Sequence, residues 1–203
     1  MISNIVSWLV ILWFVFRYYS IPKKDRMYST IVPASYLISS PNRTEIQKNV
    51  ECAAFSSAFV LRHFGMESEG DQLYSRYPRK LLDGTVYPKA ITVFFKRLGY
   101  SCTYLHGNIN TLRQQISRGV PVILFIRVHA DRRFLHFVPV VGYDETHFYL
   151  AESLDFKRNC EEPLYNRKIS VSELESLWKP WLPFSRRSYI VIEPKLNSLD
   201  KSA

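Results

Sequence analysis

One cysteine stands where the sequence could support covalent chemistry. Cys52 precedes an almost wholly apolar segment, residues 53–64, and Gly65 is a natural C-terminal stop, so we predict a buried helix of about three turns. Cys52 then lies in the first turn, where unpaired backbone N–H groups and the helix dipole favour the nucleophilic thiolate. The alternative is that Cys52 is a small buried hydrophobe, which is common for a free cysteine.

A thiol nucleophile needs a base, and the base needs a third group that orients it. His63 lies in the same predicted helix, about 16 Å from Cys52 along the helix axis, and is too far away. His136 lies at the beginning of a predicted strand with two-residue periodicity, residues 135–141. The end of a strand holds a side chain in a fixed position, which suits a catalytic base. The other histidines, in a predicted loop or at strand ends, are His106, His129 and His147.

A candidate third group ends the next predicted strand. Residues 149–152 finish with Glu152, and in a hairpin the start of the first strand lies beside the end of the second. We therefore expect His136 and Glu152 to be neighbours. The alternative is a hydrogen-bonded core histidine and a solvated strand-end glutamate, each with its own structural role.

The order of the predicted elements indicates an α+β fold, because helices dominate the first half and a mainly antiparallel sheet follows. The apolar run 120–128 has the pattern of a central strand that is covered on both faces. The other predicted elements are helices at 72–77, 88–98, 111–118 (capped by Asn110) and 170–178, and strands at 135–142, 147–151, 165–169 and 188–193.

Several motifs in a fixed order together resemble one known family. Gln47 precedes Cys52 on its apolar helix, and the segments 119–123, 136–144 and 149–152 follow. These motifs are similar to those of the bacteriocin-processing cysteine peptidases, a papain-like family that includes double-glycine leader peptidases and their stand-alone relatives. The resemblance covers residues 42–180, nearly all of the chain after the N-terminal segments.

The resemblance implies a papain-like fold and a role for each motif residue. Cys52 matches the nucleophile, and His136 matches the general base that later acts as an acid. Glu152 matches the position of the acid that orients the histidine. Gln47 matches the glutamine whose side-chain amide, with the backbone N–H of Cys52, stabilises the tetrahedral oxyanion.

Three features differ from the family's usual pattern. Ala53 stands where the family generally has glycine, Glu152 replaces an aspartate, and Gln47 is one residue nearer the cysteine. Asp155 in place of Glu152, and Asn49 in place of Gln47, are therefore alternatives. Pro139 interrupts a predicted strand, which an edge position or a bulge would tolerate.

The N-terminal segment is apolar and is followed by basic residues. Residues 5–16 contain one polar side chain, and Arg17, Lys23, Lys24 and Arg26 come after them. A secretory signal peptide has its positive charges before the apolar run. We therefore predict an uncleaved single-pass transmembrane anchor, whose flanking charges would place the domain in the cytoplasm. A buried N-terminal helix and a signal peptide are the alternatives.

The chain of 203 residues, 47% of them hydrophobic, suffices for one well-packed domain. We predict an anchor with its basic flank at 1–26, a linker at 27–41, a papain-like domain at 42–194 and a polar tail at 195–203.

The charge and the cysteines argue against several classes of function. The net charge of +9 comes without a nucleic-acid motif, so we expect no nucleic-acid partner. Three cysteines at wide and irregular spacing favour free thiols in a reducing compartment, with Cys102 in a buried strand and Cys160 in an exposed loop. The histidines and cysteines lack paired ligand spacing, so we expect neither a metal nor another cofactor.

The sequence thus predicts a membrane-anchored cysteine peptidase that acts on a peptide or leader substrate through an acyl-enzyme. Two alternatives keep the same fold. One is a catalytically silent module that binds a peptide or a protein. The other is a transferase that passes the acyl group to an acceptor other than water.

Overall fold

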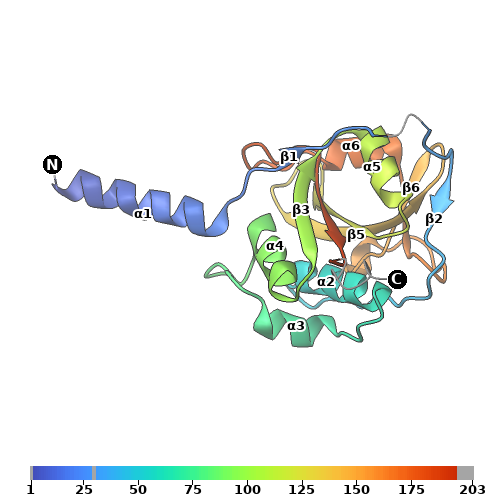
Figure 1. The fold of residues 1–203 in the computed structure, drawn as a ribbon, viewed down its shortest axis with the longest axis horizontal. Helices are drawn as coiled ribbons and strands as arrows, with labels where there is room; N and C mark the ends of the chain where they lie inside the picture. Colours follow the sequence, from blue (N-terminus) through green and yellow to red (C-terminus); the bar gives the residue numbers. More distant parts are fainter. Residues whose placement is uncertain (1, 29–30, 196–203) are drawn as a thin grey trace, which may run out of the picture.

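The computed structural model describes residues 2–28 and 31–195, with side chains from Val6 onward, and this part of the chain forms one eight-stranded sheet with helices on both faces (Figure 1). The predicted polar tail lies outside the described residues except for Lys195. The strands are β1 (Lys23–Lys24), β2 (Tyr36–Leu37), β3 (Ser101–His106), β4 (Val122–Arg127), β5 (Leu135–Tyr143), β6 (His147–Leu150), β7 (Arg167–Ser170) and β8 (Ser188–Glu193). The helices are α1 (Ile2–Tyr18), α2 (Cys52–His63), α3 (Gly70–Arg76), α4 (Pro88–Arg97), α5 (Ile109–Ile116) and α6 (Val171–Leu177), with a 3₁₀ turn at Asp155–Lys157.

The sheet is almost entirely antiparallel. Its strands lie in the order β1-β3-β8-β4-β5-β6-β7, β2 pairs separately with β5, and β1 runs parallel to β3. The α+β class and the mainly antiparallel sheet are therefore confirmed.

Strand β4 shows why helices cover both faces. Ile123 and Phe125 point into a core with α2 and α4, whereas Leu124 and its neighbours at two-residue spacing point into a core with α5 and α6. The strand is buried on both faces, as its continuous apolar run predicts. The sheet thus separates two hydrophobic cores, and Cys52 packs against the core on the side that carries α2.

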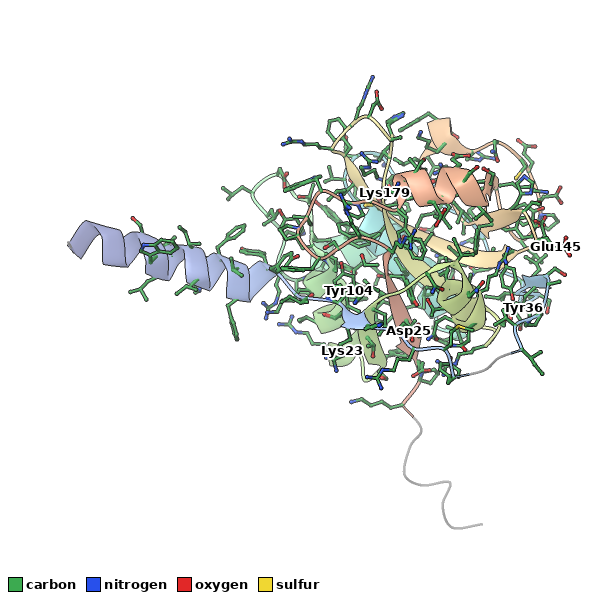
Figure 2. The ribbon with its side chains drawn as sticks, turned by 90° about the horizontal axis from the view of Figure 1, so that it is seen from above. Lys23, Asp25, Tyr36, Tyr104, Glu145 and Lys179 are labelled. Carbon is green, nitrogen blue, oxygen red and sulfur yellow. The ribbon has the colours of Figure 1, made fainter. Side chains whose placement is uncertain are left out.

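Two short strands come from segments that the sequence analysis assigned to the anchor's flank and to the linker. The β1 strand pairs Lys23 with Leu105, and Asp25 N–H donates to His106 O at 2.8 Å. Figure 2 shows Lys23 and Asp25 beside Tyr104 of β3. Strand β2 pairs with the end of β5. Two-residue strands carry no periodicity, so the sequence pattern could not indicate them.

The third predicted helix begins earlier than expected. Its N-cap is Asn108 and not Asn110, because Asn108 Oδ1 accepts the Thr111 N–H at 3.0 Å. The Thr111 hydroxyl in turn accepts the Asn108 N–H at 2.8 Å. This reciprocal capping needs partners three positions apart in the sequence, a spacing that Asn108 and Thr111 satisfy.

Pro139 lies in a central strand and not at a sheet edge. It faces Ile123 of β4, and its carbonyl accepts the Ala151 N–H at 2.9 Å. The pairing of β5 with β6 shifts register between Val140 and Gly142, so a bulge follows the proline. The bulge was one of the two expected ways to accommodate this residue.

The N-terminal helix α1 projects away from the domain (Figure 1). Its 17 residues extend about 26 Å along the helix axis, whereas the hydrocarbon core of a bilayer is about 30 Å thick. In residues 2–28 and 31–195, no helix is long and apolar enough to cross a membrane. The prediction of a transmembrane anchor is therefore not supported, because the regular helix ends at Tyr18.

Helix α2 is fixed against β5 by a hydrogen bond from its first turns. Strand β6 pairs with β5 only from Val140 onward, which leaves the beginning of β5 without a neighbour on that side. There, Ser56 Oγ donates to Phe137 O at 2.9 Å, and both groups are buried. This contact sets the position of Cys52, one turn earlier in α2, relative to His136.

We expect Ser56→Ala to lower the free energy of unfolding by about 1–3 kcal/mol, because it removes a partner of the buried Phe137 carbonyl. Urea denaturation measures this difference. The matched control is Ser75→Ala, which removes an exposed hydroxyl bonded within its own helix, and which should change stability by less than about 0.5 kcal/mol. Equal effects of the two substitutions would contradict the proposed docking contact.

Candidate active site

Cys52 and His136 line the same cleft. The cleft has a volume of about 490 Å³ and is bordered by the segments 47–52, 81–87, 125–137 and 154–156, together with Trp181. Cys52 begins α2 at one wall, and His136 is the second residue of β5 at the other. Cys52 is half-buried, and its side chain lies close enough to His136 to raise the pKa of the imidazole.

The imidazole of His136 is held by a buried carboxylate. His136 Nε2 lies 2.7 Å from Glu152 Oε1, and the two side chains are 2% and 0% exposed. Because Nε2 faces Glu152, the other ring nitrogen, Nδ1, is left for the thiol of Cys52. The expected neighbourhood of His136 and Glu152 is therefore observed, with Glu152 just beyond the end of β6.

Glu152 also has partners that the sequence analysis missed. Arg167 Nη1 donates to Glu152 Oε2 at 2.8 Å, and the Leu154 N–H donates to Oε1 at 2.8 Å. Asn166 braces the backbone of Glu152, since its side-chain oxygen accepts the Glu152 N–H at 2.7 Å and its amide donates to Glu152 O at 2.9 Å. Arg167 occupies an inward position of β7, and a charged residue at a buried position of a strand is the signal that could have identified it.

These contacts fix the charges of the pair. Burial lowers the pKa of His136, but the Glu152 carboxylate and the neighbouring Cys52 side chain outweigh burial and raise this pKa above its ordinary value. Burial raises the pKa of Glu152, but His136 and Arg167 outweigh it and lower this pKa. At neutral pH the site therefore favours an imidazolium beside a carboxylate.

Gln47 lies at the cleft beside Cys52 and is held at both ends of its amide. Its oxygen accepts the Ser153 hydroxyl at 2.6 Å, and its Nε2 donates to Asn49 O at 2.6 Å. The backbone N–H of Gln47 also donates to Ser153 O at 2.9 Å. Since a primary amide has two N–H groups, one of them stays available for a ligand in the cleft. Ser153 is a second residue that the sequence analysis missed.

The alternative residues are placed differently. Asp155 is exposed in the 3₁₀ turn, where it pairs with Arg158 at 3.2 Å and does not reach His136. Asn49 borders the cleft, but it contacts Gln47 through its backbone carbonyl. These positions favour Glu152 over Asp155 as the partner of the histidine.

The other thiols and histidines lie in different surroundings. Cys102 is buried in β3, and burial raises its pKa to about 12. Cys160 is half-buried in a loop, and burial also raises its pKa. His129 borders the cleft, with its Nδ1 3.2 Å from Lys157 Nζ. Across the described residues, no group of three histidine, cysteine or acidic side chains could hold a metal ion.

Comparison with solved structures shows the same fold in several peptidases. The peptidase domain of Streptococcus ComA, a bifunctional ABC transporter of a quorum-sensing pathway, superimposes with a TM-score of 0.56 at 14% identity, over 77% of this chain and 100% of that one. A double-glycine motif protease from an AMS/PCAT transporter, in complex with the leader peptide, gives 0.54 at 15% identity, over 78% and 96%. A C39-like peptidase from Bacillus anthracis gives 0.58 at 16% identity, over 76% and 96%.

At such low identities these structures support the fold alone. Among curated protein sequences there is no match to this chain. The sequence model of the Peptidase C39 family, however, matches residues 42–184, which is more than half of the chain. The match includes Gln47, Cys52, His136 and Glu152. The chain therefore belongs to the Peptidase C39 family of cysteine peptidases.

Proposed function

We propose that this chain hydrolyses a peptide bond with Cys52 as nucleophile, His136 as general base and acid, Glu152 as the group that orients His136, and Gln47 as an oxyanion donor. The observation that carries the proposal is the buried pair of His136 and Glu152, whose side chains approach to 2.7 Å. This contact uses Nε2 of His136 and leaves Nδ1 for Cys52, which lies at the beginning of α2. If His136 and Glu152 served only to stabilise the fold, a thiol in the same cleft would not be needed.

In the first step, the Cys52 thiol passes its proton to His136 Nδ1, and the resulting thiolate attacks the carbonyl carbon of the substrate, whose oxygen gains the negative charge. The backbone N–H of Cys52 and the remaining N–H of the Gln47 amide are suited to bind this oxygen, because both border the cleft. Ser153 keeps the amide in its orientation by donating to the amide oxygen.

In the second step, the imidazolium of His136 donates its Nδ1 proton to the departing amine, and the peptide bond breaks. The acyl group stays on the Cys52 sulfur as a thioester. Water then attacks this thioester while His136 accepts a proton from the water, and the acid product leaves as the sulfur regains its electron pair. Glu152 stabilises the imidazolium throughout, and Arg167 keeps Glu152 ionised.

We assign double-glycine leader peptides as the substrate class. Two findings support this: the chain matches the Peptidase C39 family, and a structure with the same fold is a double-glycine motif protease in complex with its leader peptide. A papain-like acyltransferase or a silent peptide-binding module would use the same cleft, and the experiments below separate these outcomes.

We also propose that α1 associates with a lipid surface without spanning it. Its described side chains from Val6 to Phe16 are exposed, and all are apolar except Ser7. Basic residues follow at Arg17, Lys23 and Lys24, where anionic headgroups would attract them. Such contact would bring the peptidase close to substrates at a membrane, and a cytoplasmic location remains part of this proposal.

We expect the full-length protein to cleave a peptide that carries a Gly-Gly pair. Cys52→Ala should lower kcat/KM by at least about 10³-fold, because this substitution removes the nucleophile. Mass spectrometry of the products identifies the bond that is cut. The control is Cys160→Ala, which should keep full activity. Turnover that depends on an added amine would instead indicate a transferase, and binding without turnover would indicate a silent module.

We expect the double variant Glu152→Gln/Arg167→Met to move the alkaline limb of the pH profile of kcat/KM to lower pH. Glu152 raises the pKa of His136, so removing its charge lets the imidazolium lose its proton at a lower pH. Replacing Arg167 as well avoids a buried unpaired charge, which would cost about 3–5 kcal/mol. The matched control, Asp155→Asn, should leave the profile unchanged, and a shift in that variant would point to Asp155 instead.

We expect the full-length protein to float with vesicles of phosphatidylcholine and phosphatidylserine in a density gradient. Leu9→Lys/Leu12→Lys should remove most of this binding, because both side chains are exposed on α1. The control Leu82→Lys/Leu98→Lys adds the same charge at exposed leucines of the domain and should still float. Loss of binding in the control alone would contradict a role for α1.

A further inference from the structure

A second hollow, distinct from the catalytic cleft, lies between the end of β4 and the segment 179–186. Its volume is about 440 Å³, and its lining combines basic and apolar side chains without an acidic one. The basic side chains are Arg127, Lys179 and Arg186. Trp181 and Phe184 are the exposed aromatic residues of the lining.

The three basic side chains of this hollow have no acidic partner. Within residues 2–28 and 31–195, none of them takes part in an ion pair. Arg127 Nη2 donates to Ser176 O at 2.9 Å, while its buried Nε has no hydrogen-bond partner. Lys179 and Arg186 are exposed, and Figure 2 shows Lys179 just after α6. A hollow lined by one sign of charge concentrates ligands of the opposite sign.

The hollow adjoins the catalytic cleft, because Trp181 lines both. The indole N–H of Trp181 donates to Arg133 O at 3.0 Å and so fixes the wall that the two cavities share. On the cleft side of this wall, Arg132 and Arg133 also lack ion-pair partners in the described part of the chain. Unpaired positive charge thus continues from the hollow into the cleft.

The segment that forms the hollow has a defined shape. Phe184 and Arg187 adopt positive φ angles of 60° and 53°, which residues other than glycine rarely do. The Ser188 hydroxyl donates to Ser185 O at 2.7 Å, and the Arg187 N–H donates to Trp178 O at 3.0 Å. Strained backbone that is held by such contacts is typical of binding sites.

We infer that this hollow binds an acidic part of the peptide substrate, outside the bond that is cut. Carboxylates would lie against Lys179 and Arg186, and apolar side chains next to them would pack on Trp181 and Phe184. The inference rests on the proposed function for the identity of the ligand as a substrate. It assigns the chain a preference for double-glycine peptides with glutamate or aspartate in a flanking segment.

Binding tests the inference independently of cleavage. Fluorescence anisotropy would compare full-length Cys52→Ala with labelled Gly-Gly peptides that carry four glutamates on the N-terminal or the C-terminal flank, and with the same peptides in which glutamine replaces glutamate. We expect at least one glutamate peptide to bind about tenfold more tightly than its glutamine counterpart at low salt. Raising the salt to about 0.5 M should reduce the difference, because exposed charges are then screened.

The decisive variant is Lys179→Glu/Arg186→Glu, in which the preference for glutamate should disappear. The matched control is Lys96→Glu/Arg97→Glu, which changes the net charge equally at exposed positions that line neither cavity, and which should keep the preference. Equal binding of all peptides, or an equal loss in both variants, would overturn the inference. If the preference holds but the protein with Cys52 intact cleaves no peptide, the proposed function fails and the acidic-peptide site stands.

Discussion

The buried carboxylate of Glu152 is the constraint on which the rest of the site depends. Removing a carboxylate from water costs several kcal/mol, and only close charged partners and hydrogen bonds offset that cost. Those partners come from separate places: His136 from β5, Arg167 from β7 and the Leu154 N–H from the turn that follows β6. A shift of one residue in the pairing of β5, β6 and β7 would turn these side chains to opposite faces and leave the charge unpaired.

Part of this arrangement could be predicted from the sequence, because it depends on local pairing. The hairpin of β5 and β6 places His136 and Glu152 together, and two-residue periodicity together with the turn between them was sufficient to expect it. Gly65 ends α2 with a φ of 78°, so the extent of that helix could also be predicted. Gln47 could be named as a candidate site residue only through the resemblance to papain-like peptidases.

The rest depended on contacts between distant segments. Arg167 lies on a strand whose register against β6 could not be fixed from its four residues, and Ser153 meets Gln47 across a gap of 106 positions. The end of α1 is similar: side chains of Arg79 and Lys89 donate to the carbonyls of Arg17 and Phe16, and so meet the negative end of the helix dipole. Apolar patterning indicates the helix but not where its end is attached.

Two consecutive residues, Glu152 and Ser153, hold different parts of the site. The first holds the imidazole of His136, and the second holds the amide of Gln47. In the proposed mechanism, a displacement of this dipeptide would therefore disturb proton transfer and oxyanion binding together. The positions of His136 and Gln47 therefore depend on one short segment. A ligand or contact that moved residues 152–153 would impair proton transfer and oxyanion binding together.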